Sequence, residues 1–182
     1  MKLILAFLLF VIFGDAIFTE DNINRKRLNK EIENRFHLSG FDLRKTAISK
    51  VPQGDSENGI FWNIESKNEL VGFVYTGRVF SCSKTGCTVG QSSMNDENAE
   101  FFDYFILFDK TKSVTSVVVY NYEATHGQEI TAKGWLKQFT GFNGGRNLVV
   151  GKNIDSISGA TISVNAITAD IVLKTALIKN LN

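Results

Sequence analysis

Aromatic and β-branched residues gather in three stretches in the middle of the chain. The stretches run from Phe61 to Glu65, from Leu70 to Phe80, and from Phe101 to Asp109 through a turn at residues 110–112 into Val114 to Tyr122. Polar residues fill the turns between them, and such runs are typical of β-strands. The pattern therefore predicts an antiparallel β-sheet.

Apolar residues near helical spacing lie on both sides of this predicted sheet. Between Thr19 and Leu38, apolar groups stand at this spacing among many charges, and the residues that provide them are Ile23, Arg27 (through its aliphatic stem), Leu28, Ile32 and Phe36. After the sheet, the i, i+3, i+4, i+7 pattern of one apolar helical face is made by Ala132, Trp135, Leu136 and Phe139. We expect an amphipathic N-terminal helix and a second helix that ends near Gly141.

The longest apolar stretch with helical periodicity closes the chain. It runs from Ser158 to Leu181, with Val164, Ile167 and Ile171 on one stripe. A helix this apolar is expected to be largely buried.

Two weaker segments join these elements. Residues 39–60 contain scattered Gly, Pro, Ser and Asp and are predicted as a connection, with one short strand around Ala47 to Val51. After a loop at Gly144-Gly145, residues Leu148 to Val150 are expected to form another short strand. The prediction is one α+β domain, an antiparallel sheet with packed helices and a long C-terminal helix.

Length and composition agree with one globular domain. The chain has 182 residues, 43% of them hydrophobic and 15 of them Phe, which is enough for one sizeable core. Its 20 basic and 19 acidic residues leave a net charge of +1. Such a balance creates no overall field for nucleic acid or an anionic membrane, so we expect no nucleic-acid partner.

The first residues predict export. Lys2 precedes an unbroken apolar run from Leu3 to Phe13, and Gly14-Asp15-Ala16 follows with small residues where a signal peptidase reads. The run is well short of the roughly 20 residues that span a bilayer, so residues 1–16 are predicted as a cleaved signal peptide. The alternative is an uncleaved anchor extended through Phe18, with Asp15 inside it at considerable cost.

Both alternatives place the rest of the chain outside the cytoplasm, in the periplasm or on the outer face of the cytoplasmic membrane. Residues 19–60 would then form an N-terminal helix and connection, and residues 61–182 the main domain.

Cys82 and Cys87 flank a turn-like stretch, and in an oxidising compartment they form either a disulfide or two unpaired thiols. The chain has no haem-attachment motif, and two Cys with two distant His make a poor zinc set.

Ser158-Gly159-Ala160-Thr161 opens the last predicted helix. With Ser158 as N-cap, Thr161 falls in the first turn, where backbone N–H groups lack partners and the helix dipole is positive. A phosphate would be stabilised there, and Gly159 would let it approach the backbone. The alternative is a plain helix cap. Ser163 also offers a hydroxyl, but helical rotation points it elsewhere.

Asp155, six residues before Thr161, together with Ser-Gly-Ala-Thr resembles the flavinylation motif of the FMN-binding domain family. This family includes flavinylated subunits of respiratory sodium pumps and related electron-transfer complexes. The resemblance implies that Thr161 carries FMN through a phosphoester. It further implies that a flavin transferase using FAD and Mg²⁺ attaches the group, with Asp155 as part of what the transferase recognises.

Other segments resemble the family in the same order, over roughly residues 69–180. Leu70 to Tyr75 is similar to its opening strand and Phe105 to Val119 to its central hairpin. Glu123 to Glu129 resembles the Glu-Thr-x-Gly stretch near the flavin, although Ala124 interrupts the Glu-Thr pair. The glycine-rich stretch usual before the hairpin is replaced by the Cys82 to Cys87 loop.

Several residues could contact the cofactor or could have ordinary roles. Glu123, Thr125 and His126 either orient the flavin ring or cap and solvate a loop. Trp135 either packs on the ring or belongs to the core stripe. Gly144-Gly145-Arg146 either approaches the phosphate or forms a plain turn.

The resemblance implies an electron carrier more than a stand-alone enzyme. The sequence shows no nucleophile with a paired base, no metal cluster and no dinucleotide-binding glycine pattern. We therefore expect an exported flavoprotein that passes electrons between a membrane redox donor and an extracytoplasmic acceptor. The alternatives are a flavin-dependent reductase with a soluble acceptor and a cofactor-free exported binding module.

Overall fold

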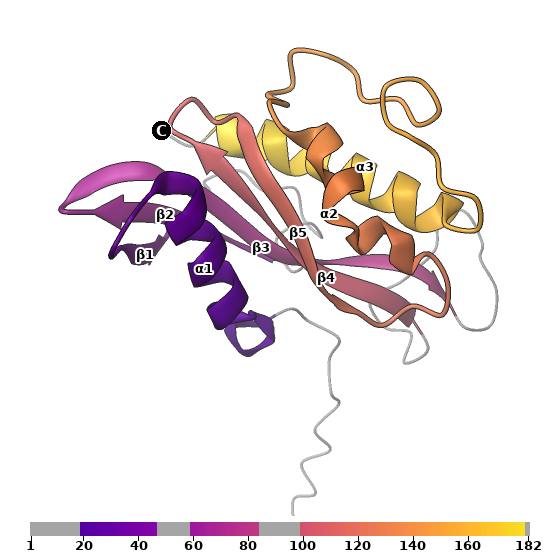
Figure 1. Ribbon diagram of the computed structural model, residues 1–182, viewed down its shortest axis with the longest axis horizontal. Helices are drawn as coiled ribbons and strands as arrows, with labels where there is room; N and C mark the ends of the chain where they lie inside the picture. The colour runs from indigo at the N-terminus through magenta and orange to yellow at the C-terminus, as the bar shows by residue number, and fades with distance from the viewer. Residues whose placement is uncertain (1–18, 47–58, 84–98, 181–182) are drawn as a thin grey trace, which may run out of the picture.

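The computed structural model of the protein describes residues 19–46, 59–83 and 99–180, and a five-stranded antiparallel sheet forms its centre (Figure 1). The strands lie side by side in chain order and comprise β1 (Asp42–Lys45), β2 (Gly59–Ser66), β3 (Glu69–Ser83), β4 (Ala99–Asp109) and β5 (Val114–Tyr122). The predicted antiparallel sheet and the α+β class are confirmed. Most strands are longer than their aromatic and β-branched stretches.

Helices cover both faces of this sheet because its strands alternate apolar side chains between the two faces. On β4, Phe102 and Tyr104 face the cluster that contains α2 (Lys133–Leu136) and α3 (Thr161–Lys179). Phe105 and Leu107 face the opposite cluster, which contains α1 (Arg25–Phe36). The domain therefore has three layers, with the sheet in the middle (Figure 1).

The N-terminal helix predicted between Thr19 and Leu38 is confirmed. A 3-10 turn, η1 (Glu20–Asn22), precedes α1, whose N-terminus is capped by the Asn24 side chain accepting from the Arg27 N–H at 3.0 Å. Leu28 and Ile32 are completely buried against the sheet. The apolar stripe on α1 thus closes one face of the domain.

The helix predicted around Trp135 is present but divided. It consists of α2 between two 3-10 turns, η3 (Gln128–Thr131) and η4 (Lys137–Phe139). Leu136 and Phe139 are buried in the core, as their spacing predicts.

Two predictions about the connecting segments are wrong. Residues Asp42–Lys45, taken as part of a connection, form the edge strand β1 and pair with β2. Their mostly charged side chains do not give the apolar pattern of a strand, but an edge strand with one open side tolerates such residues. Leu148–Val150 does not form a strand, since only a single bridge joins Val150 to Ile154. The strand expected at 47–51 lies outside the described residues.

The start of the C-terminal helix also differs from the prediction. α3 begins at Thr161 and not at Ser158. Val164, Ile167 and Ile171 are completely buried, as expected, but Ile162 and Val172 are each 39% exposed. α3 is long and apolar enough to cross a membrane by length and composition alone, and half of it is buried within this domain.

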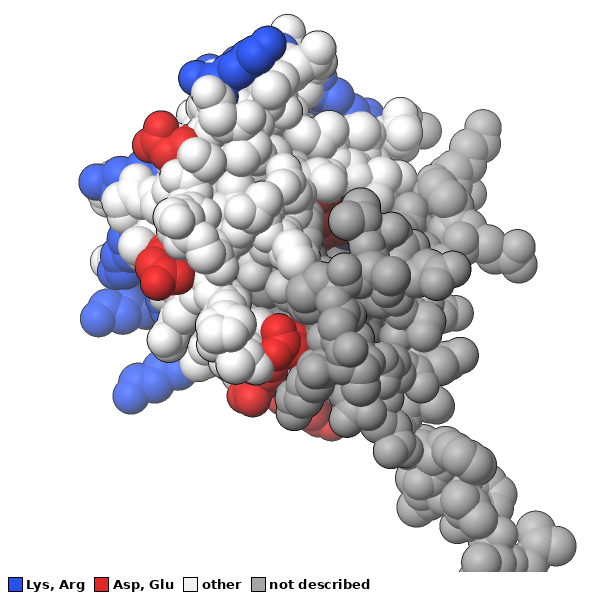
Figure 2. Space-filling model, turned by 90° about the vertical axis from the view of Figure 1, so that its right-hand side faces the viewer, with Lys and Arg blue, Asp and Glu red and all other residues white. Residues whose placement is uncertain are grey.

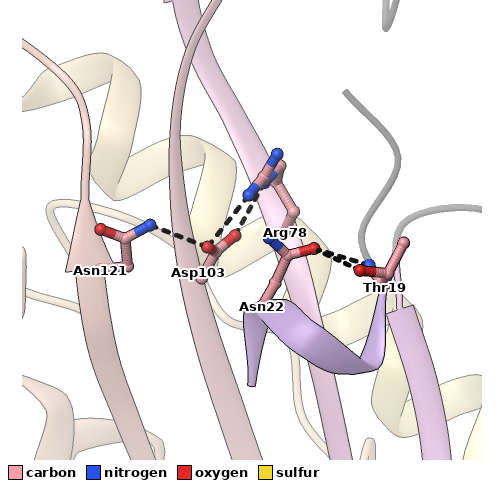
Figure 3. Close-up of polar contacts among 5 residues, drawn as sticks. All are labelled: Thr19, Asn22, Arg78, Asp103 and Asn121. Atoms are coloured by element: carbon pink, nitrogen blue, oxygen red, sulfur yellow. Dashed lines mark hydrogen bonds and ion pairs between the residues drawn. The ribbon is translucent and has the colours of Figure 1, made fainter. Parts of the chain in front are cut away.

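Side chains from three neighbouring strands form a polar cluster. Arg78 on β3 forms a bidentate ion pair with Asp103 on β4, at 2.8 and 3.1 Å, and Asn121 on β5 donates to the same carboxylate (Figure 3). The predicted signal peptide and Cys87 lie outside the described residues, so the export and disulfide predictions stay predictions.

Candidate functional site

The first turn of α3 is open at its N-terminus. Ala160 is the N-cap residue and provides no side-chain hydrogen bond, while its carbonyl accepts the first helical bond from the Val164 N–H at 2.9 Å. Ser158 therefore does not cap the helix as predicted, and it lies exposed in the preceding turn. Thr161 is exposed at the first helical position. Among the described residues no side chain caps this turn, so its N–H groups and the positive end of the helix dipole are suited to an anion.

A tight turn from Ile157 to Ala160 explains the later helix start. The Ala160 N–H donates to the Ile157 carbonyl at 3.1 Å, and Gly159 has φ +80°, the left-handed conformation that the third position of a type II turn requires. A Cβ on Gly159 would meet no atom within 4 Å. The backbone beside Thr161 is thus open to an approaching group.

Ser163 does not share this exposure. Its side chain is buried, and its hydroxyl lies 2.9 Å from that of Ser81 on β3 and 3.0 Å from that of Tyr122 on β5. Burial raises the pKa of Tyr122 above its ordinary value of 10.0, so this phenol stays protonated at neutral pH. The three hydroxyls tie the first turn of α3 to the sheet, whereas Thr161 in the same turn is exposed.

The loop after β5 packs directly against this turn. Gly127 has φ +92°, and a Cβ there would lie 2.9 Å from the Ser163 hydroxyl and 3.3 Å from the Ala160 Cβ. The Tyr122 hydroxyl also donates to the His126 carbonyl. The structure therefore brings the loop that contains Glu123, Thr125 and His126 next to the start of α3.

The three residues of that loop predicted to contact the flavin ring are all exposed, but their hydrogen bonds differ. Thr125 donates its N–H to the carboxylate of Glu100 at 3.0 Å, and its hydroxyl donates to the same oxygen. Glu100 is only 7% exposed. Sequence reasoning missed it, because one acidic residue at a strand start carries no recognisable signal. His126 and Glu123 have exposed side chains, and the Glu123 N–H donates to the Phe101 carbonyl at 2.9 Å.

Asp155 is fixed by its main chain while its side chain is exposed. Its N–H donates to Gln138 Oε1 at 2.7 Å, and its carbonyl accepts from the indole Nε1 of Trp135 at 2.9 Å. Gln138 also donates through Nε2 to the Trp135 carbonyl at 3.0 Å. Trp135 is half-buried and packs edge-on against Phe139, with ring centroids 5.4 Å apart. Trp135 thus belongs to the apolar stripe and also contacts the motif.

Gly144-Gly145-Arg146 lies at the opposite end of α3. A Cβ on Gly144 would lie 3.4 Å from the Nζ of Lys179, the last residue of the helix. A helix of 19 residues is about 28 Å long, so this segment is remote from Thr161. It forms a turn in which Asn143 Oδ1 accepts from the Gly145 N–H at 2.9 Å.

Figure 2 shows the molecule from the right-hand side of Figure 1, the side on which α3 begins. Most of the described surface there belongs to uncharged residues, with Asp and Glu side chains at a few separate places and Lys and Arg toward the left margin and top. Exposed carboxylates in the segments that lead toward the start of α3 are Glu123 in the loop after β5, Glu129 in η3, and Asp155. Among the described residues, no group of three His, Cys, Asp or Glu side chains could hold a metal ion.

Residues 101–172 match the model of the FMN-binding domain. The matched segment runs from β4 into α3 and contains the loop after β5, the Asp155 main-chain contacts and the turn before Thr161. None of the curated proteins compared with the chain matches it.

Proposed function

We propose that the protein is an exported flavoprotein carrying FMN on Thr161 through a phosphoester, and the proposal starts from the match of residues 101–172 to the FMN-binding domain model. In this proposal it passes electrons between a membrane redox donor and an extracytoplasmic acceptor. The observation that carries the attachment site is the exposed Thr161 hydroxyl at the uncapped N-terminus of α3.

The residues around this turn fit the phosphate of FMN. A phosphodiester is anionic, and the free N–H groups and dipole of the first helical turn favour that charge. Gly159 and Ala160 add no bulk beside it, and the open space over Gly159 leaves room for the ester. Ser158 contributes an exposed hydroxyl to the preceding turn.

In this proposal the loop after β5 would offer side chains to the flavin ring. Glu123, Thr125 and His126 are exposed on a loop that packs against the same helical turn. FMN supplies one- and two-electron chemistry when bound, and the protein supplies attachment, orientation and electrostatic surroundings. The exposed carboxylates near the site would disfavour added negative charge on the ring and so favour a low reduction potential.

Covalent attachment suits an exported carrier. A dissociable FMN would be diluted into the surroundings once it left its site, whereas a phosphoester keeps it on the protein. The apolar run after Lys2 supports export to the periplasm or the outer face of the cytoplasmic membrane. The membrane partners would be electron-transfer components, and the modifying partner a flavin transferase that uses FAD and Mg²⁺ and recognises Asp155.

The first prediction tests the acceptor. The protein is co-expressed with a flavin transferase, denatured, and examined in a gel for flavin fluorescence and by mass spectrometry. Wild type is expected to retain fluorescence, and Thr161→Ala to lose it. Ser163→Ala is the matched control, because this hydroxyl lies two residues away but is buried between Ser81 and Tyr122.

Two outcomes would contradict the assignment. Fluorescence that persists in Thr161→Ala moves the acceptor elsewhere, and an unlabelled wild type supports a module without covalent flavin. Steady-state turnover of the flavinylated protein with soluble acceptors would indicate a reductase in place of a carrier.

A further inference from the structure

The main chain before Thr161 is held at several points. Upstream, Ile154 is completely buried and its carbonyl accepts from the Gly151 N–H at 2.8 Å. Asp155 is held by Trp135 and Gln138, and the Ile157 to Ala160 turn follows. The Asp155 and Thr161 side chains are nevertheless exposed. The segment is therefore a rigid backbone that presents two exposed functional side chains.

Both polar main-chain atoms of Asp155 are bound by side chains from one short helical unit. Trp135 belongs to α2 and Gln138 to η4, and the bond from Gln138 Nε2 to the Trp135 carbonyl joins the two. An exposed Asp155 could hydrogen-bond water in place of these side chains, so the bonds are not needed to satisfy buried groups. They fix the Asp155 main chain, and with it the direction in which the Cα–Cβ bond leaves the backbone.

We propose that Trp135 and Gln138 are positioning residues for flavinylation, which hold Asp155 in the orientation that the flavin transferase reads while Thr161 reacts. This inference rests on the proposed function. In the reaction, the Thr161 oxygen forms a bond to the FMN phosphorus of FAD, and the pyrophosphate P–O bond breaks. AMP leaves with that oxygen, and the hydroxyl proton passes to a base or water. No atom is oxidised or reduced.

Preorganisation is the physical reason for such a device. A free segment of this length would lose its conformational entropy when the transferase binds, which weakens binding. Only the fraction of molecules with the correct backbone would react. Removing one of the two side-chain bonds would lower that fraction by about fivefold, the factor that corresponds to one net hydrogen bond.

The test uses two substitutions that remove the bonds with little change in shape. Trp135→Phe removes the indole N–H but keeps an aromatic ring against Phe139, and Gln138→Leu removes both amide contacts. Trp62→Phe is the matched control, because the Trp62 Nε1 donates to Thr76 at 3.1 Å on the opposite face of the sheet. Purified proteins are incubated with flavin transferase, FAD and Mg²⁺, and initial rates of FMN incorporation are followed by mass spectrometry.

Each of the two site variants is expected to react about fivefold more slowly than wild type. The loss should lie mainly in KM for the protein substrate, with Tm close to that of wild type. Hydrogen exchange of residues 155–161 in the unmodified protein should be faster in both variants. Trp62→Phe should react at the wild-type rate with unchanged exchange in this segment.

Wild-type rates for Trp135→Phe and Gln138→Leu would overturn the inference and leave the proposed function intact. Slow reaction without faster exchange would also overturn it, because the two side chains would then contact the transferase directly. An unmodified wild type in this assay contradicts the proposed function itself, so the two failures are distinguishable.

Discussion

Gly127 is the residue that allows the loop after β5 to approach the start of α3. A side chain is disfavoured there for two separate reasons, the φ of +92° and the lack of room for a Cβ beside Tyr122 and Ser163. Gly127→Ala is expected to cost about 3 kcal/mol in free energy of unfolding, from backbone strain and from the displaced hydroxyls together. Urea denaturation measures the loss.

Gly141→Ala separates the cost of backbone strain from the cost of steric contact. Gly141 has φ +80°, but a Cβ there would meet no atom within 4 Å. Its substitution is expected to cost about 1 kcal/mol, from the backbone alone. Equal losses at the two glycines would show that packing against Ser163 contributes nothing.

Tyr120 has a buried polar atom without a described hydrogen-bond partner. Its hydroxyl is buried and has no hydrogen bond within the described part of the chain, while its ring stacks on Phe105 at 6.0 Å. Tyr120→Phe keeps the ring and removes an unpaired polar atom, so it should stabilise the protein by about 1 kcal/mol. Tyr122→Phe is the control and should destabilise it, because that hydroxyl contacts His126 and Ser163. Thermal unfolding of both variants would decide, and a destabilised Tyr120→Phe would contradict the argument.

At the scale of elements, three strands are joined by the Arg78–Asp103 pair and Asn121 (Figure 3). The two charged side chains are 8% and 1% exposed, and the Arg78 guanidinium lies 3.6 Å above the Phe101 ring. Arg78→Met would leave the Asp103 carboxylate buried with Asn121 as its described partner. Removing one member of such a pair is expected to cost about 3 to 5 kcal/mol in unfolding free energy.

The matched control is Arg44→Met on β1. Arg44 forms a 3.0 Å ion pair with Glu65, but its side chain is 66% exposed, so its removal should cost no more than about 1 kcal/mol. The double variant Arg78→Met with Asp103→Leu should recover a large part of the loss, because it leaves no unpaired charge. Equal losses at Arg78 and Arg44 in urea denaturation would refute this difference.

The elements that the sequence predicted correctly are those with strong periodicity. β3, β4 and β5 have long aromatic and β-branched runs, and α1 has a clear apolar stripe. β1 was missed because an edge strand of four mostly charged residues has no apolar alternation. The start of α3 was misplaced by three residues because Ser158 is a good N-cap type, and the left-handed turn at Gly159 prevents that use.

The site was predictable only where one contiguous motif defines it. Asp155 and Thr161 lie close in sequence, so their relation is visible without a structure. The contacts of Ser163 with Ser81 and Tyr122 join three distant elements, and those of Asp155 reach Trp135 and Gln138, about 20 residues earlier in the chain. Such tertiary pairs leave no periodic signal, and only the fold reveals them.

At the scale of the whole molecule, the two helical layers have different tasks. α1 closes the face of the sheet that contains Trp62 and Phe105. α3 closes the other face and places its N-terminal turn at an end of the sheet, beside the loop after β5. The first turn of α3 is thus supported by the core, and Thr161 on it is exposed, which the proposed attachment requires.

Buried tyrosines should make the whole protein sensitive to alkaline pH. Burial, followed by the nearby charge of Asp170, raises the pKa of Tyr104 well above its ordinary value of 10.0, and the Tyr104 hydroxyl donates to that carboxylate. Burial and then the charge of Asp103 likewise raise the pKa of Tyr120.

Above pH 10 the unfolded chain releases these protons while the folded protein retains them, so stability falls as pH rises. The stability that these phenols contribute is fully present below the pKa of an unfolded tyrosine. Above that pKa, Tyr104 alone should lower the free energy of unfolding by up to about 1.4 kcal/mol per pH unit. Urea midpoints measured between about pH 8 and pH 11 test this slope. Tyr120→Phe should make the slope shallower, because it removes one titrating group whose hydroxyl has no described hydrogen bond. A midpoint that stays constant above pH 10 would show that the buried phenols ionise in the folded protein as readily as in the unfolded chain.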